Sequence, residues 1–83
     1  MNNKYFTIIT FYQFKIIKDK NYIITKLKDF CKFNKIKGTI LIADEGINGT
    51  IAGLEKNINS FILYLENFSF EKLNLKRSKY KYM

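Results

Sequence analysis

Residues 38–53 read GTILIADEGINGTIAG and lie in the middle of the chain. Gly38 precedes a β-branched and apolar run, Thr39 to Ala43, of a kind typical of a strand. The segment DEGING at residues 44–49 holds two glycines at a spacing that favours a tight reversal, because glycine tolerates the positive φ of such turns. Residues 50–52 are expected to return as the partner strand. The stretch therefore predicts a β-hairpin in the middle of the chain.

The hairpin is flanked on both sides by segments with helical spacing. In residues 21–34 the apolar positions share one helical stripe, which consists of Ile23, Ile24, Leu27, Phe30 and Cys31. Asp19 or Asn21 is expected to cap the start of this helix, and Asn34 to end it in a left-handed conformation. Residues 55–68 repeat the helical spacing.

Strands are predicted at both ends of the chain. Residues 5–14, YFTIITFYQF, carry apolar side chains on both faces, which is typical of an interior strand. A short final strand is expected to begin near Glu71. The order β-α-β-β-α-(β) predicts an α+β, ferredoxin-like (acylphosphatase-like) fold, with one antiparallel sheet and two helices on one face. We expect the last edge strand to be short or missing, and residues 1–83 to form a single domain.

Charge is distributed unevenly along these 83 residues, whose formal net charge is +8. Residues 15–37 carry +6 and residues 72–83 carry +5, whereas residues 38–71 carry −4. Near the C-terminus, basic residues alternate with tyrosines, a combination that suits phosphate attraction and base stacking. The candidate RNA-contacting residues are Lys76, Arg77, Lys79 and Lys81. The competing interpretations are an exposed tail here and, for the lysines of residues 15–37, a solvated helix face.

Several kinds of site are excluded by composition. The chain has no histidine, which rules out a Cys/His zinc site and a Ser/His/Asp triad, so we expect no metal ligand and no catalytic residue. Its one cysteine, Cys31, lies on the apolar helical stripe and is interpreted as a small buried side chain. Asp44 and Glu45 are adjacent and should point to opposite sides, so they are not expected to share a proton. A lone cysteine without a signal or membrane segment is typical of a cytoplasmic protein.

The hairpin stretch resembles the N-terminal domain of the rhodanese-like tRNA uridine hydroxylases. The resemblance runs from about residue 10 to residue 77, and its most specific part is the small-residue-Glu-Gly-Ile-Asn-Gly-Thr hairpin. The residues that carry the motif are Glu45, Gly46, Asn48, Gly49 and Thr50. For this hairpin we weigh two interpretations, an ordinary Asn48-Gly49 turn and a backbone cradle that faces RNA or a rhodanese domain.

The resemblance implies an N-terminal accessory domain, or a fragment, of an oxidoreductase of tRNA modification. Proteins of this family use oxygen to convert the wobble uridine of certain tRNAs to 5-hydroxyuridine, with a catalytic cysteine in a following rhodanese domain. That domain is absent from this chain, so the resemblance implies no cofactor and no catalytic residue here. The implied partners are tRNA and a rhodanese domain encoded downstream. The sequence departs from the family at Leu54, where a Ser or Thr usually caps the second helix.

Two alternatives from other classes remain. The chain could be a stand-alone ferredoxin-like interaction module, with weak self-association or dimerisation through an exposed sheet edge. Acylphosphatase-type hydrolysis on a similar fold relies on an arginine in a phosphate loop. Since Arg77 is the only arginine, this activity ranks below the others.

Overall fold

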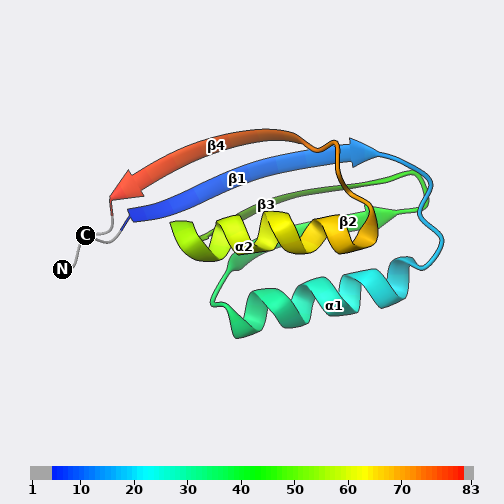
Figure 1. Cartoon of the computed structure of the whole chain (residues 1–83), viewed down its shortest axis with the longest axis horizontal. Coiled ribbons are helices and arrows are strands. Elements are labelled where there is room, and N and C mark those ends of the chain that lie inside the picture. Colours follow the sequence, from blue (N-terminus) through cyan, green and yellow to red (C-terminus); the bar gives the residue numbers. More distant parts are fainter. Residues whose placement is uncertain (1–4, 82–83) are drawn as a thin grey trace.

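Four antiparallel strands form one sheet in the computed structural model, and two helices cover one of its faces (Figure 1). The structure describes residues 5–81, with side chains for residues 5–79. The elements are β1 (Tyr5–Phe14), α1 (Lys20–Phe33), β2 (Lys37–Ala43), β3 (Gly46–Leu54), α2 (Glu55–Leu65), a 3-10 turn (Glu66–Phe68) and β4 (Asn74–Lys81). The α+β, ferredoxin-like prediction is therefore confirmed.

The strands lie in the order β2-β3-β1-β4, so β1 and β3 are the interior strands. β1 pairs with β3 from Phe6 opposite Leu54 to Phe14 opposite Gly46. Side chains alternate between the two faces along each strand. Ile9 and Phe11 of β1 are buried under the helices, whereas Tyr12 and Phe14 are exposed. The apolar side chains on both faces of residues 5–14 thus reflect an interior strand with one covered and one uncovered face.

The expectation of a short or missing last strand is wrong. β4 has eight residues and pairs with β1 from Tyr5 opposite Lys81 to Tyr12 opposite Asn74. It begins at Asn74 and not near Glu71. Its sequence, NLKRSKYK, contains one aliphatic residue, so an apolar pattern could not reveal the full length of the strand. Backbone pairing with β1 determines its conformation, and the charged side chains are tolerated because β4 is an edge strand.

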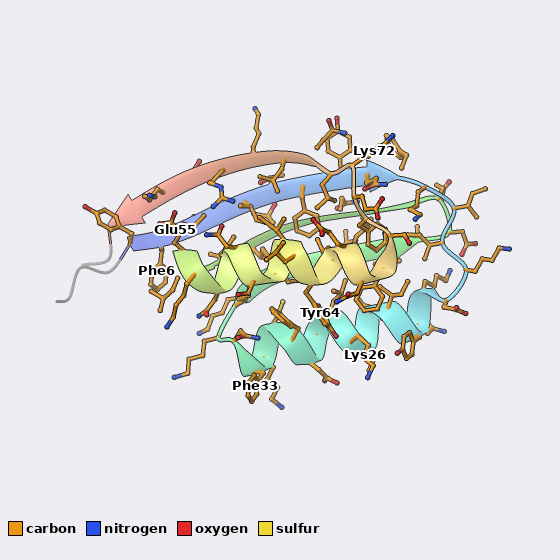
Figure 2. All side chains as sticks on the ribbon, in the orientation of Figure 1. Phe6, Lys26, Phe33, Glu55, Tyr64 and Lys72 are labelled. Atoms are coloured by element: carbon orange, nitrogen blue, oxygen red, sulfur yellow. The ribbon has the colours of Figure 1, made fainter. Side chains whose placement is uncertain are left out.

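The core lies between the sheet and the two helices. Its residues have at most 9% of their surface exposed and are Ile9, Phe11, Ile17, Ile23, Leu27, Ile36, Ile47, Ile51, Ile58, Phe61, Leu65 and Phe70. The helices also contact each other, because Phe30 of α1 stacks on Tyr64 of α2 with ring centroids 4.4 Å apart. Figure 2 shows Tyr64 between the two helices and Phe33 on the side of α1 away from the sheet.

The helix ends differ from the expected caps. Asp19 occupies the N-cap of α1, but its side chain makes no capping hydrogen bond, and Leu54 provides none for α2. At the end of α1 the left-handed residue is Lys35, with φ 55°, whereas Asn34 has φ −100°. The backbone N–H of Ile36 donates to the carbonyl of Cys31 at 2.8 Å, as in a Schellman motif. Burial of Ile36 in the core stabilises this ending.

Candidate nucleic-acid interface

The turn between β2 and β3 is shorter than predicted. It consists of Asp44 and Glu45, because Ala43 still pairs with Gly46 across the hairpin. Both turn carbonyls accept hydrogen bonds from the β1–α1 connection, Asp44 from the N–H of Ile17 at 2.8 Å and Glu45 from that of Lys15 at 3.1 Å. The Asp44 carboxylate also lies 2.9 Å from the ammonium of Lys20, at the start of α1. The turn is thus fixed by its neighbours, and the two carboxylates are not combined into one site.

Gly46, Asn48, Gly49 and Thr50 lie within β3 and not in the turn, so the expected Asn48-Gly49 turn is wrong. The backbone of Gly49 stands between Phe11 of β1 and Ile40 of β2. Gly46 and Gly49 are strand residues and neither has a positive φ, so they do not form a glycine turn. Gly49 has a packing role, since an added Cβ would lie 2.6 Å from the carbonyl oxygen of Thr39 and 2.8 Å from the ring of Phe11.

The face of the sheet opposite the helices, here called the open face, contains the two polar motif residues of β3. One row across it consists of Thr39, Thr50, Thr10 and Lys76, on β2, β3, β1 and β4 in turn. The next row consists of Leu41, Asn48, Tyr12 and Asn74. All eight side chains are exposed. The family motif therefore places Asn48 and Thr50 in the centre of a surface that other elements leave uncovered.

The C-terminal basic residues are not a single cluster. Arg77 and Lys79 lie on the helix side of β4, where Arg77 donates to the side-chain oxygen of Asn59 at 3.0 Å and Lys79 forms an ion pair with Glu55 at 3.2 Å. Lys76 lies on the open face opposite Thr10. The side chain of Lys81 is outside the described residues. Of the predicted RNA-contacting residues with described side chains, Lys76 is the one that forms no hydrogen bond or ion pair with α2.

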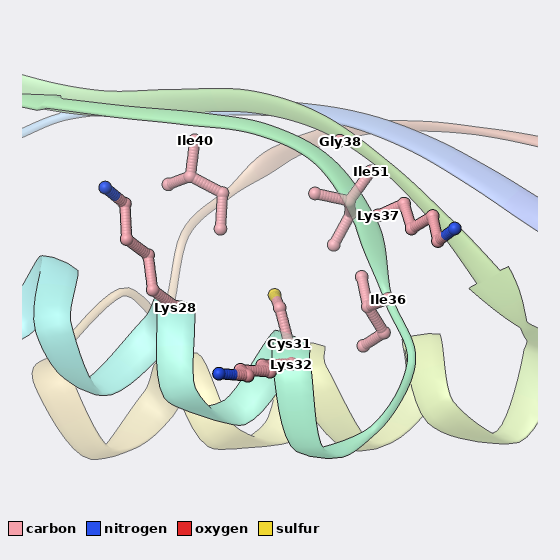
Figure 3. Close-up of a pocket in the computed structure, with 8 residues that line it drawn as sticks. All are labelled: Lys28, Cys31, Lys32, Ile36, Lys37, Gly38, Ile40 and Ile51. Carbon is pink, nitrogen blue, oxygen red and sulfur yellow. The ribbon is translucent and has the colours of Figure 1, made fainter.

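A second basic surface surrounds a cavity of about 220 Å³ between α1 and β2, shown in Figure 3. Its rim carries Lys28 and Lys32 from α1 and Lys37 from β2, and we call these three residues the lysine rim. Within residues 5–79, none of the three forms an ion pair. The cavity between them is lined by apolar side chains and Cys31, with no acidic residue among its lining residues, so the three charges remain available to an anion.

Cys31 points from α1 into this cavity (Figure 3). Burial raises the pKa of its thiol to about 11, because desolvation disfavours the charged thiolate. The side chain is only partly buried, but it packs against the core. Its interpretation as a small apolar residue is consistent with this environment, and a thiol held neutral is a poor nucleophile.

Two features of the interface were not singled out by sequence patterning. The lysine rim depends on the approach of α1 to the edge strand β2, and Tyr12 and Phe14 become a surface pair only when one sheet face stays uncovered. The alternation of residues 5–14 already places both rings on one side, which is the signal that could have found them. In the part of the chain that the structure describes, no cluster of acidic or sulfur side chains could hold a metal ion. Nor is any helix in residues 5–81 long and apolar enough to cross a membrane.

Comparison with known proteins relates this geometry to a family. The chain is 41% identical over 61 residues to the tRNA uridine(34) hydroxylase of Ehrlichia ruminantium (strain Welgevonden), covering 74% of this chain and 22% of that protein. It is 42% identical over 76 residues to that of Prochlorococcus marinus (strain NATL1A), covering 88% and 24%. It is 41% identical over 80 residues to that of Wolbachia sp. subsp. Brugia malayi (strain TRS), covering 93% and 29%.

The chain therefore spans roughly a quarter of the length of these curated relatives. Its residues 6–83 match the family model described as the UPF0176 acylphosphatase-like domain, which accounts for nearly the whole chain. The fold, the hairpin and the match agree, and the chain belongs to the UPF0176 acylphosphatase-like domain family, the N-terminal domain of tRNA uridine hydroxylases.

Proposed function

We propose that this chain serves as the N-terminal accessory domain of an oxygen-dependent tRNA wobble-uridine hydroxylase in the cytoplasm, and that it assists tRNA binding. The similarity to proteins named tRNA uridine(34) hydroxylase supports the substrate class. In this proposal the chemistry belongs to a rhodanese domain with its own catalytic cysteine. The present chain contributes binding, because Cys31 is held neutral and the sequence has no histidine to serve as a base.

The observation that carries this proposal is the lysine rim. Lys28 and Lys32 stand one helical turn apart on α1, and Lys37 lies at the adjacent edge of the sheet. Lysines that neutralise phosphates release counterions from RNA, which makes binding favourable at low salt and independent of base sequence. A tRNA backbone suits such a surface because it presents repeated phosphates at fixed spacing. All three rim lysines belong to the basic segment, residues 15–37, and none belongs to the acidic segment, residues 38–71.

Packing against the rhodanese domain is the other role that the resemblance implies. A packing surface of this kind is expected to be apolar at its centre and depleted in lysine. The lysine rim encloses apolar side chains, but its three lysines make it richer in lysine than such a surface, which favours the nucleic-acid role for this side of the domain. Stand-alone dimerisation through the β4 edge has little support, because that edge carries Lys76, Arg77 and Lys79, and charged edges resist strand pairing.

A filter-binding titration with an unmodified tRNA transcript tests the proposal at two salt concentrations. We expect binding at low salt that weakens steeply as salt is raised. Lys28→Glu should lower the affinity about tenfold. Lys56→Glu on α2 is the matched control, because it makes the same charge change at an exposed helix lysine that does not line the cavity. Failure of the chain to bind tRNA at low salt, or equal losses in the two variants, would contradict the proposal.

A further inference from the structure

The open face carries a hollow that no helix covers. One cavity, of about 410 Å³, is lined by residues that include Tyr12, Phe14 and Asn48. A second, of about 380 Å³, is lined by residues that include Thr10, Tyr12, Asn48 and Thr50. Because both are lined by Tyr12 and Asn48, they form one continuous surface along the middle of the sheet.

Two aromatic rings occupy one end of this surface. Phe14 has 81% of its surface exposed and Tyr12 has 45%, which is unusual for large rings on an interior strand. Their centroids are 5.8 Å apart in an edge-to-face arrangement, so the edge of one ring contacts a face of the other and the two rings do not bury each other as a parallel stack would. A flat π-face that is exposed and held on a rigid strand can stack on a nucleobase of any identity.

Polar groups that suit a nucleotide lie beside the rings. Asn48 and Asn74 flank Tyr12 in the same row and can donate to and accept from the edges of a base. In the next row the hydroxyls of Thr10 and Thr50 are 3.2 Å apart, and Lys76 stands at the end of that row. The row of Thr10 and Thr50 thus ends in a positive charge on β4, next to the row that contains Tyr12. Bases on the rings and a phosphate near Lys76 would use all of these groups.

We infer that the open face binds unpaired nucleotides of RNA, with bases stacked on Tyr12 and Phe14 and the backbone passing Lys76. This inference rests on the proposed function, which supplies RNA as the partner, and adds which part of an RNA is held. A four-stranded sheet whose exposed aromatic residues stack bases is a known solution for single-stranded RNA. A duplex offers no exposed base faces, so the open face should discriminate between paired and unpaired RNA.

Charge and composition favour RNA over a protein on this face. Its two central rows contain three threonines, two asparagines and a lysine, with Leu41 as the single aliphatic residue. A protein-docking surface normally has a more apolar centre and fewer lysines. Glu45 is the one acidic residue that lines the larger cavity, and it lies in the turn at its margin. The chain as a whole carries +8, which attracts a polyanion.

Fluorescence anisotropy with two labelled probes tests the inference. One probe is a single-stranded oligouridylate and the other is a blunt duplex RNA of the same length. Tyr12→Ala and Phe14→Ala should each weaken binding of the single strand about tenfold and leave duplex binding unchanged. Phe33→Ala is the matched control, because Phe33 is 86% exposed but lies on α1 away from the sheet (Figure 2). Circular dichroism melts of each variant show that the fold is retained.

The outcomes separate this inference from the proposed function. If the unsubstituted chain binds duplex and single strand with the same salt dependence, and Tyr12→Ala and Phe14→Ala behave like Phe33→Ala, the open-face inference fails while RNA binding stands. If the chain binds neither probe at low salt, both fail. If the two ring variants change the molar mass in light scattering without changing RNA affinity, the open face is a protein contact and the inference is overturned.

Discussion

Arg77 donates from Nη1 to the Oδ1 atom of Asn59 at 3.0 Å, which ties the only arginine of the chain to α2. Its neighbour Lys76 points to the opposite side of β4, into the row that contains Thr10. Two adjacent basic residues therefore face different surroundings. One helps to hold the edge strand against a helix, and the other faces solvent on the open face.

This contrast predicts different effects for two neighbouring substitutions. Lys76→Ala should weaken RNA binding several-fold and reduce the slope of log affinity against log salt by about one, because one phosphate contact is lost. Arg77→Ala should leave that slope unchanged and lower the free energy of unfolding by about 0.5 kcal/mol, as expected for an exposed hydrogen bond. Salt-dependent RNA titrations of both variants measure the slope, and urea melts of both variants measure the free energy of unfolding. A reduced salt slope in Arg77→Ala with none in Lys76→Ala would reverse the assignment.

Gly49 is predicted to be essential for stability rather than for binding. In Gly49→Ala the new methyl group would overlap the Thr39 carbonyl and the Phe11 ring, and we expect a loss of about 3 kcal/mol in the free energy of unfolding. Gly53→Ala is the control on the same strand, because its nearest neighbour would be the Cγ1 atom of Ile36 at 3.3 Å, a much less severe contact. It should lose about 1 kcal/mol or less. Equal urea midpoints for the two variants would show that packing does not explain Gly49.

Thr7 offers a route to a more stable chain. It is fully buried on β1, and its hydroxyl has no hydrogen-bond partner within the described residues. Thr7→Val replaces this hydroxyl by a methyl group of similar size, which should raise the free energy of unfolding by about 1 kcal/mol. Thr10→Val, on the exposed side of the same strand, removes the contact with Thr50 and should not stabilise. A lower melting temperature for Thr7→Val would indicate that the hydroxyl is satisfied in solution.

The thiol of Cys31 is predicted to react slowly. Since burial raises its pKa from 9.0 to about 11, alkylation by iodoacetamide near pH 8 should be about a hundredfold slower in the folded chain than in urea. The same pKa shift makes the free energy of unfolding depend on pH. The folded state favours the neutral thiol, so this contribution to stability is present below pH 9 and is lost as the pH rises towards 11. An alkylation profile with the same midpoint in the folded and urea-unfolded chain would contradict the shift.

Much of the architecture could be predicted from local patterns. Residues 5–14 form β1 with the predicted bounds, and the predicted helix over residues 21–34 differs from α1 by one residue at each end. The predicted helix over residues 55–68 corresponds to α2 and the 3-10 turn that follows it. These segments were predictable because apolar spacing reflects burial on one face, and burial is where most of the stabilisation of a small domain originates.

The errors have a common physical cause. The predicted turn covers residues 44–49, yet Gly46 to Gly49 lie in β3, because the close approach of Gly49 to Phe11 and Thr39 also demands glycine. The last strand was expected to be short or missing, although backbone pairing with β1 extends it over eight residues. Glycine needed for a turn and glycine needed for a close approach look alike in a sequence. A polar edge strand likewise resembles a solvated tail.

The sequence by itself determined the α+β fold class, the lack of residues for histidine-based catalysis, and a hairpin that carries the motif of a family. Only the tertiary structure decided which charges are available. It placed Arg77 and Lys79 against α2, gathered Lys28, Lys32 and Lys37 around one cavity, and left Tyr12 and Phe14 on an uncovered sheet face. Charge and aromatic content are properties of composition, but their accessibility depends on which elements pack together.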